Sequence, residues 1–280
     1  MKRSLYKMGN VFISVNEIDV DQVKWIDARF ALQDVEAGRK QYEQLHIQHA
    51  IHWDLDQDLS NPNNGGGRHP LPTKAELIDL FEKSGLQIDD AIVVYDQGGN
   101  PFATRAWWIL QYAGFTNARI ALDGFDALQA AGVPVSSEHP VIERTTVTPN
   151  WNEQLYASRE FVEDIVAGIN DTTLIDARAA KRYRGEHEPL DRVAGHIPTA
   201  LNFDWEQLKK DDQYDLSDDV KEQLAQLTAG KEKVAVYCGS GVTATPLYAM
   251  LKHHGFDNVR LYVGSYSDWV SKEDAPIETE

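Results

Sequence analysis

Short apolar runs alternate with amphipathic segments along the whole chain. The runs 92–95 and 234–237 are uninterrupted and contain mainly β-branched and aromatic residues, which is typical of buried strands. Further strand candidates lie at 11–15, at 25–29 and at 51–55. The helix candidates share helical apolar spacing or capping residues: 38–44, 73–85, 105–114, 158–166 and 244–252. This alternation predicts an α/β fold with mostly parallel sheets flanked by helices.

The chain contains two copies of one pattern. Trp25-Ile26-Asp27-Ala28-Arg29 matches Leu174-Ile175-Asp176-Ala177-Arg178, and His46-Ile47 matches His196-Ile197. Further on, the run 92–95 with Asp96 matches 234–237 with Cys238, and 114–119 matches 255–260. Gly124-Phe125 matches Gly264-Ser265-Tyr266 only loosely. The order is kept, and the period is too long for a solenoid repeat, so the pattern indicates a duplicated domain.

Composition between the copies suggests where they divide. Residues 134–150 are rich in Pro, Ser and Thr, which is typical of a linker. We therefore expect an N-terminal domain over 10–135, a linker over 136–152 and a C-terminal domain over 153–280. The acidic end 272–280 is expected to be a frayed tail.

A short loop, Cys238-Gly239-Ser240-Gly241-Val242-Thr243, joins the second buried strand to a predicted helix. Backbone N–H groups at a helix start lack helical partners, and glycines let several of them converge on negative charge. A cysteine at the first position would be biased toward its thiolate form. A lone cysteine is often a small buried hydrophobe, but the strand, the loop and the repeat favour a nucleophilic sulfur. Because the first copy has Asp96 there, its domain is predicted to be catalytically silent.

Two other stretches hold candidate chemistry. Lys181, Arg182 and Arg184 place three positive charges within four residues, which makes either an anion clamp or a solvated basic surface. The loop 56–72 is long and rich in Asn, Gly and Pro, so it is either a functional excursion or a flexible connector. Asp56, Arg68 and His69 favour the functional interpretation.

Charge and cysteine content narrow the classes of partner. Forty-four acidic and 27 basic residues give a net charge of −17, which disfavours nucleic acid and anionic membrane surfaces. A local cradle can still bind a small anion. One cysteine excludes an intrachain disulfide framework and a multi-cysteine metal site. The start 1–10 has no apolar leader core, and no run is long enough to span a membrane, so we expect a cytoplasmic protein.

The sequence resembles the tandem rhodanese-family sulfurtransferases. The resemblance is carried by the repeated motifs, by residues 182–185 and 195–198 and by the 238–243 loop. The resemblance implies two rhodanese folds, with Cys238 cycling through a persulfide and residues 239–243 (Gly239, Ser240, Gly241, Val242 and Thr243) binding substrate. The uncharged loop is similar to that of 3-mercaptopyruvate sulfurtransferases, since thiosulfate sulfurtransferases typically carry basic residues at the positions of Gly239 and Ser240. Arg182 corresponds to the family's substrate-binding arginine. Arg192 is only a weak counterpart of a second arginine, because 186–192 departs from the family spacing.

The same resemblance implies a relay of Ser240, His69 and Asp56 beside the sulfur. The expected reaction transfers sulfur from an anionic donor to Cys238 and then to a thiol, a thioredoxin-like protein or cyanide, without a metal or an organic cofactor. Thiosulfate is the alternative donor, and a non-enzymatic sulfur carrier or redox sensor is the alternative class. A phosphatase of the Cys-x5-Arg type is disfavoured because Ala244 stands where its arginine would be.

Overall fold

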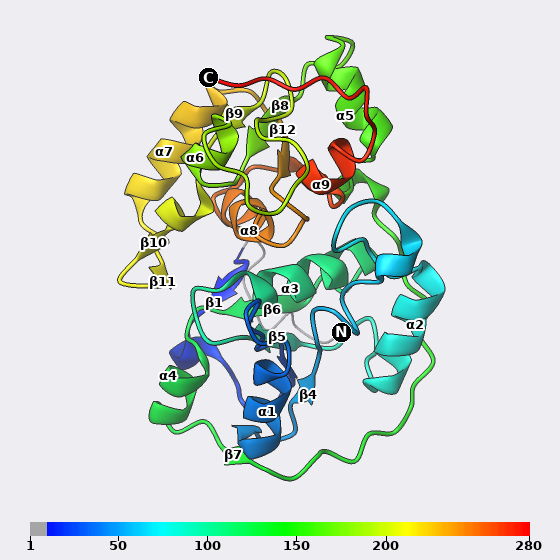
Figure 1. The fold of residues 1–280 in the computed structure, drawn as a ribbon. Helices are drawn as coiled ribbons and strands as arrows, with labels where there is room; N and C mark the ends of the chain where they lie inside the picture. The colour runs from blue at the N-terminus through cyan, green and yellow to red at the C-terminus, as the bar shows by residue number, and fades with distance from the viewer. Residues whose placement is uncertain (1–9) are drawn as a thin grey trace. The chain divides into compact units, whose positions relative to one another are not determined.

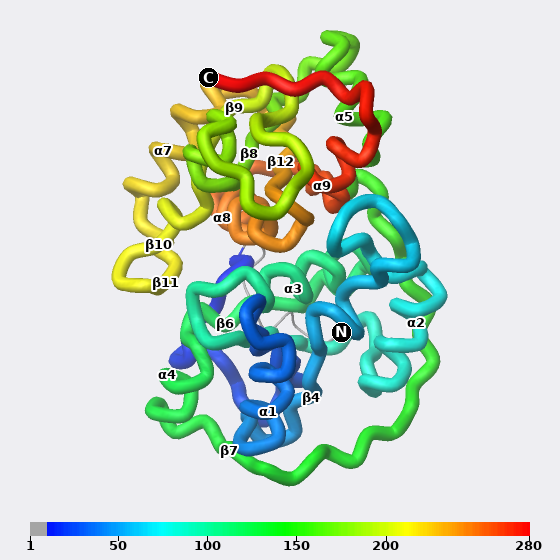
Figure 2. Tube along the Cα trace, viewed as in Figure 1, coloured from blue at the N-terminus to red at the C-terminus, as the bar shows by residue number. Residues whose placement is uncertain are grey.

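The computed structural model describes residues 10–280 and divides them into two compact units. The first unit comprises the described residues up to Asn61, with Pro72–Asn152 and Asp212–Tyr214. The second comprises Pro62–Leu71, Glu153–Asp211 and Asp215–Glu280. Most of the long 56–72 loop, drawn in cyan in Figure 2, therefore counts with the second unit. The expectation that the start of the chain has no leader core falls mostly on residues 1–9, which lie outside the described residues.

The first unit is built on a parallel five-stranded sheet of order β1-β6-β5-β2-β4 (Figure 1). Its strands are β1 (Phe12–Ile13), β2 (Lys24–Asp27), β4 (Ile51–His52), β5 (Ile92–Tyr95) and β6 (Ala118–Ala121). A separate antiparallel pair joins β3 (His46–Ile47) to β7 (Val135–Ser136). The apolar run predicted as a buried strand is β5, which lies between β2 and β6 and is buried throughout.

Four α-helices belong to the first unit: α1 (Ala37–Gln44), α2 (Lys74–Lys83), α3 (Pro101–Ala113) and α4 (Phe125–Ala130). The 3₁₀ turn η1 (Val15–Glu17) belongs to the first unit, whereas η2 (Pro62–Asn64) lies in the 62–71 segment of the second unit. The α2 helix starts at the predicted cap, where Thr73 and Glu76 form a capping box. The α3 helix starts four residues before the predicted position, because Pro101 suits a first helical turn.

The second unit has a parallel four-stranded sheet of order β13-β12-β8-β9 (Figure 1). Its strands are β8 (Thr173–Asp176), β9 (Leu201–Asn202), β12 (Lys233–Tyr237) and β13 (Asn258–Leu261). The short strand β10 (Lys209–Lys210) lies outside this sheet, and β11 (Gln213–Tyr214) counts with the first unit. Its helices are α5 (Arg159–Val166), α6 (Ala180–Tyr183), α7 (Asp218–Thr228), α8 (Thr245–His253) and α9 (Ser265–Trp269), with the 3₁₀ turns η3 (Glu153–Leu155) and η4 (Trp205–Leu208). Among residues 10–280, no helix is both long and apolar enough to cross a bilayer.

The same register repeats in both units. Asp27 on β2 pairs with Tyr95 on β5, and Asp176 on β8 pairs with Tyr237 on β12. In each unit alternate residues of the central strand enter a core cluster on one face of the sheet, Val93 and Tyr95 in the first and Ala235 and Tyr237 in the second. The predicted α/β class with parallel sheets flanked by helices is confirmed.

The expectation of a frayed C-terminal tail is wrong. His196 and Glu278 exchange two backbone hydrogen bonds of 2.9 and 3.0 Å, and Ile277 packs against the core of the second unit. The indole N–H of Trp269 also donates to the Pro276 carbonyl at 2.8 Å. The acidic composition of the segment suggested solvent, but backbone pairing and one apolar side chain hold it in place.

Candidate functional site

The repeated Asp-Ala-Arg motif forms a buried ion pair in each unit. Arg178 donates from Nε and Nη2 to the carboxylate of Asp176 at 3.0 and 2.6 Å, and its guanidinium lies 3.9 Å from the ring centre of Tyr266. In the first unit Arg29 and Asp27 have the same geometry, and Phe125 supplies the ring at 4.0 Å. Both pairs are almost fully buried, so the motif fixes the end of each sheet.

Cys238 lies at the C-terminal end of β12 and is 1% exposed. Its Sγ accepts the Gly241 N–H at 3.2 Å, so a loop amide faces the sulfur as predicted. The turn needs glycine, because Gly241 has φ +76° and a Cβ there would lie 2.1 Å from the Val263 carbonyl oxygen. Val242 is buried, and its carbonyl accepts the N–H and the hydroxyl of Thr245 at the start of α8.

Two guanidinium groups converge on the second position of this loop. A Cβ on Gly239 would lie 2.8 Å from Nη2 of Arg68 and 3.3 Å from Nη1 of Arg182. Arg182 was predicted to bind substrate, whereas Arg68 was only a feature of the long loop. The Arg68 N–H donates to Ser267 Oγ at 3.1 Å, which ties the 62–71 segment to α9 within the second unit.

Two carboxylates hold these arginines in place, and sequence reasoning missed both. Asp191 accepts hydrogen bonds from Arg68 and, at 3.1 Å, from Arg182. Glu188 accepts from Arg182 at 2.7 and 3.0 Å and also pairs with Arg178. Burial raises the pKa of Asp191, and the Arg68 charge opposes that shift. The carboxylates thus fix two cations beside Cys238 before any substrate binds.

Arg184 and Arg192, two further arginines of the 181–192 stretch, contact other partners than the Cys238 loop. Arg192, the weak candidate for a second substrate arginine, donates to the Val270 carbonyl at 3.1 Å. Arg184 pairs with the exposed Glu186, as expected for a solvated surface pair. Of the three positive charges at 181–184, Arg182 is the one that reaches Gly239.

Two residues of the predicted relay, His69 and Ser240, lie in the second unit and contact each other. His69 Nδ1 lies 2.8 Å from Ser240 Oγ, and Ser240 is two residues from Cys238. Asp56 belongs to the first unit, where its N–H donates to Asp54 Oδ1 at 2.9 Å. Burial, with a contribution from Asp54, raises the pKa of Asp56. Its part in the relay stays a prediction.

Ser265 is a site residue that the sequence analysis did not identify. Its Oγ accepts the Cys238 N–H at 3.1 Å and donates to the Tyr262 carbonyl at 2.8 Å. It is fully buried and has φ +56°, a left-handed conformation that is unusual outside glycine. The sequence feature that could have identified Ser265 is the loose match between Gly124-Phe125 and Gly264-Ser265-Tyr266. The second copy has one extra residue there, and that residue is Ser265.

We predict that Ser265→Ala lowers kcat/KM for sulfur transfer about tenfold, because the buried Cys238 N–H loses its acceptor. Ser271→Ala is the matched control, since Ser271 follows the same helix but is exposed. Steady-state rates of both variants, with their thermal midpoints, measure the effect. Equal rates for the two variants would rule out a positioning role for Ser265.

The corresponding loop of the first unit holds its own anion. Asp96 is buried, and its carboxylate accepts the Gly98 N–H at 2.7 Å and the Ala103 N–H at 3.0 Å. Amides that could face a substrate are therefore satisfied by a side chain of the same loop. Burial raises the pKa of Asp96 to about 6, against the effect of these amides.

This raised pKa predicts a pH-dependent stability of the first unit. At a pH below the ordinary pKa of aspartate, the Asp96 carboxyl is protonated in both the folded and the unfolded state. Between about pH 4 and 6 it loses its proton in the unfolded state but keeps it in the folded state. Asp96 should therefore reduce stability as the pH rises through this window, by about 3 kcal/mol in total. Asp96→Asn should remove this dependence. Native-state hydrogen exchange of β5 amides at pH 4 and pH 7 would measure it.

The exposed Asp89→Asn is the control for that experiment. It should leave the difference between pH 4 and pH 7 as in the wild type. If Asp96→Asn and Asp89→Asn gave the same pH dependence, the buried carboxylate would not be its source.

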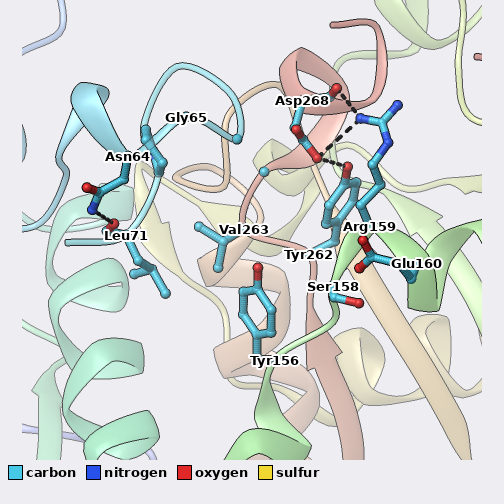
Figure 3. A pocket seen from close by; sticks show the side chains of 13 residues that line it. Asn64, Gly65, Leu71, Tyr156, Ser158, Arg159, Glu160, Tyr262, Val263 and Asp268 are labelled. Atoms are coloured by element: carbon cyan, nitrogen blue, oxygen red, sulfur yellow. Dashed lines mark hydrogen bonds and ion pairs between the residues drawn. The ribbon is translucent and has the colours of Figure 1, made fainter. Parts of the chain in front are cut away.

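A cavity of about 410 Å³ lies beside α9 in the second unit (Figure 3). Its wall includes Tyr156, Tyr262 and Arg159, and the 62–71 segment contributes Gly65 and Leu71. Arg159 donates to the main-chain carbonyls of Asp268 and, at 2.6 Å, of Trp269. Tyr262 donates to the Asp268 carboxylate. These contacts hold α9, whose first residue Ser265 supports Cys238.

Comparison with known proteins confirms the resemblance that the motifs suggested. The family model described as "Rhodanese-like domain" matches residues 15–131 and 161–272. The chain is 36% identical to a Pseudomonas aeruginosa protein named as a probable 3-mercaptopyruvate sulfurtransferase, over 91% of each chain. It is also 36% identical to a Mycobacterium tuberculosis protein named as a candidate thiosulfate sulfurtransferase, over 92% of this chain and 91% of that one. The solved 3-mercaptopyruvate sulfurtransferase from Leishmania major superposes with a TM-score of 0.83 at 26% identity, covering 95% of this chain and 75% of that one. The chain therefore belongs to the rhodanese family, as a sulfurtransferase with two rhodanese-like domains.

Proposed function

We propose that the protein transfers sulfur from 3-mercaptopyruvate to a thiol acceptor through a persulfide on Cys238. The observation that carries this proposal is the pair of guanidinium groups, Arg68 and Arg182, over Gly239 beside the buried sulfur. Mercaptopyruvate has a carboxylate and an adjacent ketone, and planar guanidinium groups can bind both through paired hydrogen bonds. The Pseudomonas aeruginosa relative and the Leishmania major structure both carry the mercaptopyruvate name.

In the first step the Cys238 thiolate attacks the thiol sulfur of the bound donor. The new S–S bond forms as the donor's carbon–sulfur bond breaks, and the electron pair of that bond leaves with the carbon as pyruvate enolate. The enolate takes up a proton and becomes pyruvate. In this proposal His69 and Ser240 deliver this proton, with Asp56 as the third member of the relay; the 2.8 Å contact between His69 Nδ1 and Ser240 Oγ supports the first two roles.

Loop amides stabilise negative charge on sulfur before and after this step. The Gly241 N–H lies at hydrogen-bond distance from Sγ, and the fixed turn requires no reorganisation when the charge moves. In the second step an acceptor thiolate or cyanide attacks the outer sulfur, which leaves as the acceptor's persulfide or as thiocyanate, and Cys238 leaves as a thiolate again. A small thiol, a thioredoxin-like protein or cyanide fits this step, and a cytoplasmic protein would meet thiol acceptors in their reduced form.

Thiosulfate is the second candidate donor, favoured by the Mycobacterium tuberculosis relative and by the same two cations. The loop itself argues for mercaptopyruvate, since Gly239 and Ser240 bring no charge. A side chain at position 239 would also require the Arg68 guanidinium to shift from its place beside the loop. The observed position of Arg68 therefore suits the glycine loop.

Parallel steady-state assays with 3-mercaptopyruvate and with thiosulfate, each with a thiol and with cyanide as acceptor, test the proposal. We expect a higher kcat/KM for mercaptopyruvate and the release of one pyruvate per transferred sulfur. A preference for thiosulfate, with release of sulfite, would keep the persulfide and overturn the donor. Inactivity with both donors would overturn the proposed reaction.

A further inference from the structure

The first unit contains a cavity where the second unit has its cation pair. It measures about 250 Å³ and is lined by Arg29, Gln41, Gln44, Leu45, Gln97, Phe125 and Asp126. Matching Asp96 to Cys238 places Gln97 at the position of Gly239. Matching Tyr42 to Tyr183, each stacked on the histidine of its His-Ile motif, places Gln41 at the position of Arg182. The cavity thus has the Gln41 amide where the second unit has the Arg182 guanidinium, and the Gln97 amide where the second unit has glycine.

Two polar groups of this cavity have unmet hydrogen bonds of opposite kind. The Oε1 atom of Gln97 is buried and accepts no hydrogen bond, while its Nε2 donates to the Phe30 carbonyl at 2.9 Å and fixes the amide. Arg29 uses Nε and Nη2 on Asp27 and the Leu45 carbonyl, and its Nη1 has no hydrogen-bond partner within residues 10–280. In the second unit the equivalent Nη1 of Arg178 binds Glu188. Buried polar groups are rarely left without partners, so the orphaned Gln97 Oε1 indicates that a donor joins it. The Nη1 group of Arg29 is not itself fully buried and is open to an acceptor.

The rest of the lining specifies the charge of that ligand. Asp126 is exposed at the rim and adds a carboxylate, whereas Leu45 and Phe125 supply apolar wall. The cavity therefore offers a cationic donor, a neutral acceptor and an anionic acceptor. Its volume is several times the roughly 30 Å³ that one water molecule occupies in the liquid, so a small organic solute fits.

We propose that this cavity binds a small zwitterionic α-amino acid. The α-carboxylate accepts from Arg29 Nη1, and the α-ammonium donates to Gln97 Oε1 and to Asp126. A simple anion would leave Gln97 Oε1 without a donor and would face Asp126, while a simple amine would leave Arg29 Nη1 without an acceptor. The site is independent of the sulfur donor's site and of the proposed function.

Titration of the full-length protein with L-alanine, propanoate and ethylamine, followed by calorimetry and saturation-transfer NMR, tests the proposal. All three probes contain the same two-carbon unit, to which alanine attaches both charged groups, propanoate only the carboxylate and ethylamine only the ammonium. We expect saturable one-site binding of alanine, with propanoate and ethylamine at least about tenfold weaker. Equal binding of alanine and propanoate, or no saturable alanine binding up to about 50 mM, would overturn the proposal.

Variants assign the binding to this cavity. Gln97→Met, of similar size, should weaken alanine binding about tenfold or more, and the exposed Asp126→Asn should weaken it severalfold. Arg182→Met removes one of the two cations beside Gly239 in the second unit and should leave alanine binding unchanged. Asp126→Asn decides the question if Gln97→Met does not fold. Loss of alanine binding in Arg182→Met but not in Asp126→Asn would place the amino acid in the second unit and refute the proposal.

Discussion

Replacement of Cys238 by serine is expected to reduce sulfur transfer by roughly 10⁴-fold or more, with either donor and every acceptor. Serine keeps the size of the side chain and the contact with the Gly241 N–H, but its oxygen cannot hold a transferable sulfur. After incubation with donor, intact mass should show one added sulfur on the wild type and none on the variant. Because Cys238 is the sole cysteine of the chain, an added sulfur has no other thiol to occupy.

Binding provides the control for this variant. Cys238→Ser should still bind pyruvate, the product left by mercaptopyruvate, with wild-type affinity, since Arg68 and Arg182 are unchanged. A variant that bound pyruvate normally yet retained substantial turnover would show that the sulfur does not pass through Cys238. The persulfide mechanism would then have to be abandoned.

The second large effect is expected at the two guanidinium groups. Arg182→Met and Arg68→Met should each raise KM for the anionic donor about 10- to 100-fold, since each removes charge-assisted hydrogen bonds to the substrate. The kcat value should fall less than kcat/KM. The double variant should lose more than either single variant. The measurement is full saturation kinetics with both donors.

Arg184→Met is the matched control for these variants. Arg184 lies two residues from Arg182, but it pairs with the exposed Glu186, so its loss should leave KM within about twofold of the wild type. If Arg68→Met behaved like Arg184→Met, Arg68 would have no part in donor binding. The anion site would then rest on Arg182 alone.

Local signals in the sequence were sufficient for the central elements of each unit. The uninterrupted apolar runs became β5 and β12, and the side-chain caps of Thr73 and Ser158 mark the starts of α2 and α5. Strands at the sheet edges were harder, because β1 and β4 have only two residues each in regular pairing. Their apolar residues continue beyond the paired segment, so hydrophobicity alone overestimates their length.

A site residue could be predicted where the same segment contains both the residue and the strand or loop that positions it. Cys238 and its loop follow from the strand before them and the glycines within them. Asp191 and Ser265 could not be found in this way, because their roles depend on atoms supplied by other segments. Asp191 resembles any surface carboxylate in sequence, and only the approach of Arg68 gives it a function. The C-terminal tail was misjudged for the same reason, since its partners are backbone atoms at His196.

The repeated ion pair also has a consequence for how this chain folds. Asp27, Arg29 and Tyr95 occupy the same register and make the same contacts as Asp176, Arg178 and Tyr237. Because β8 pairs with β12 as β2 pairs with β5, the β2 strand of one molecule can pair with the β12 strand of another in nearly the native geometry. Misassembly between similar domains is a characteristic failure of repeated chains. Refolding at high protein concentration should favour dimers in which the two molecules exchange such strands. Dilute conditions, and synthesis of the first unit before the second, reduce this exchange.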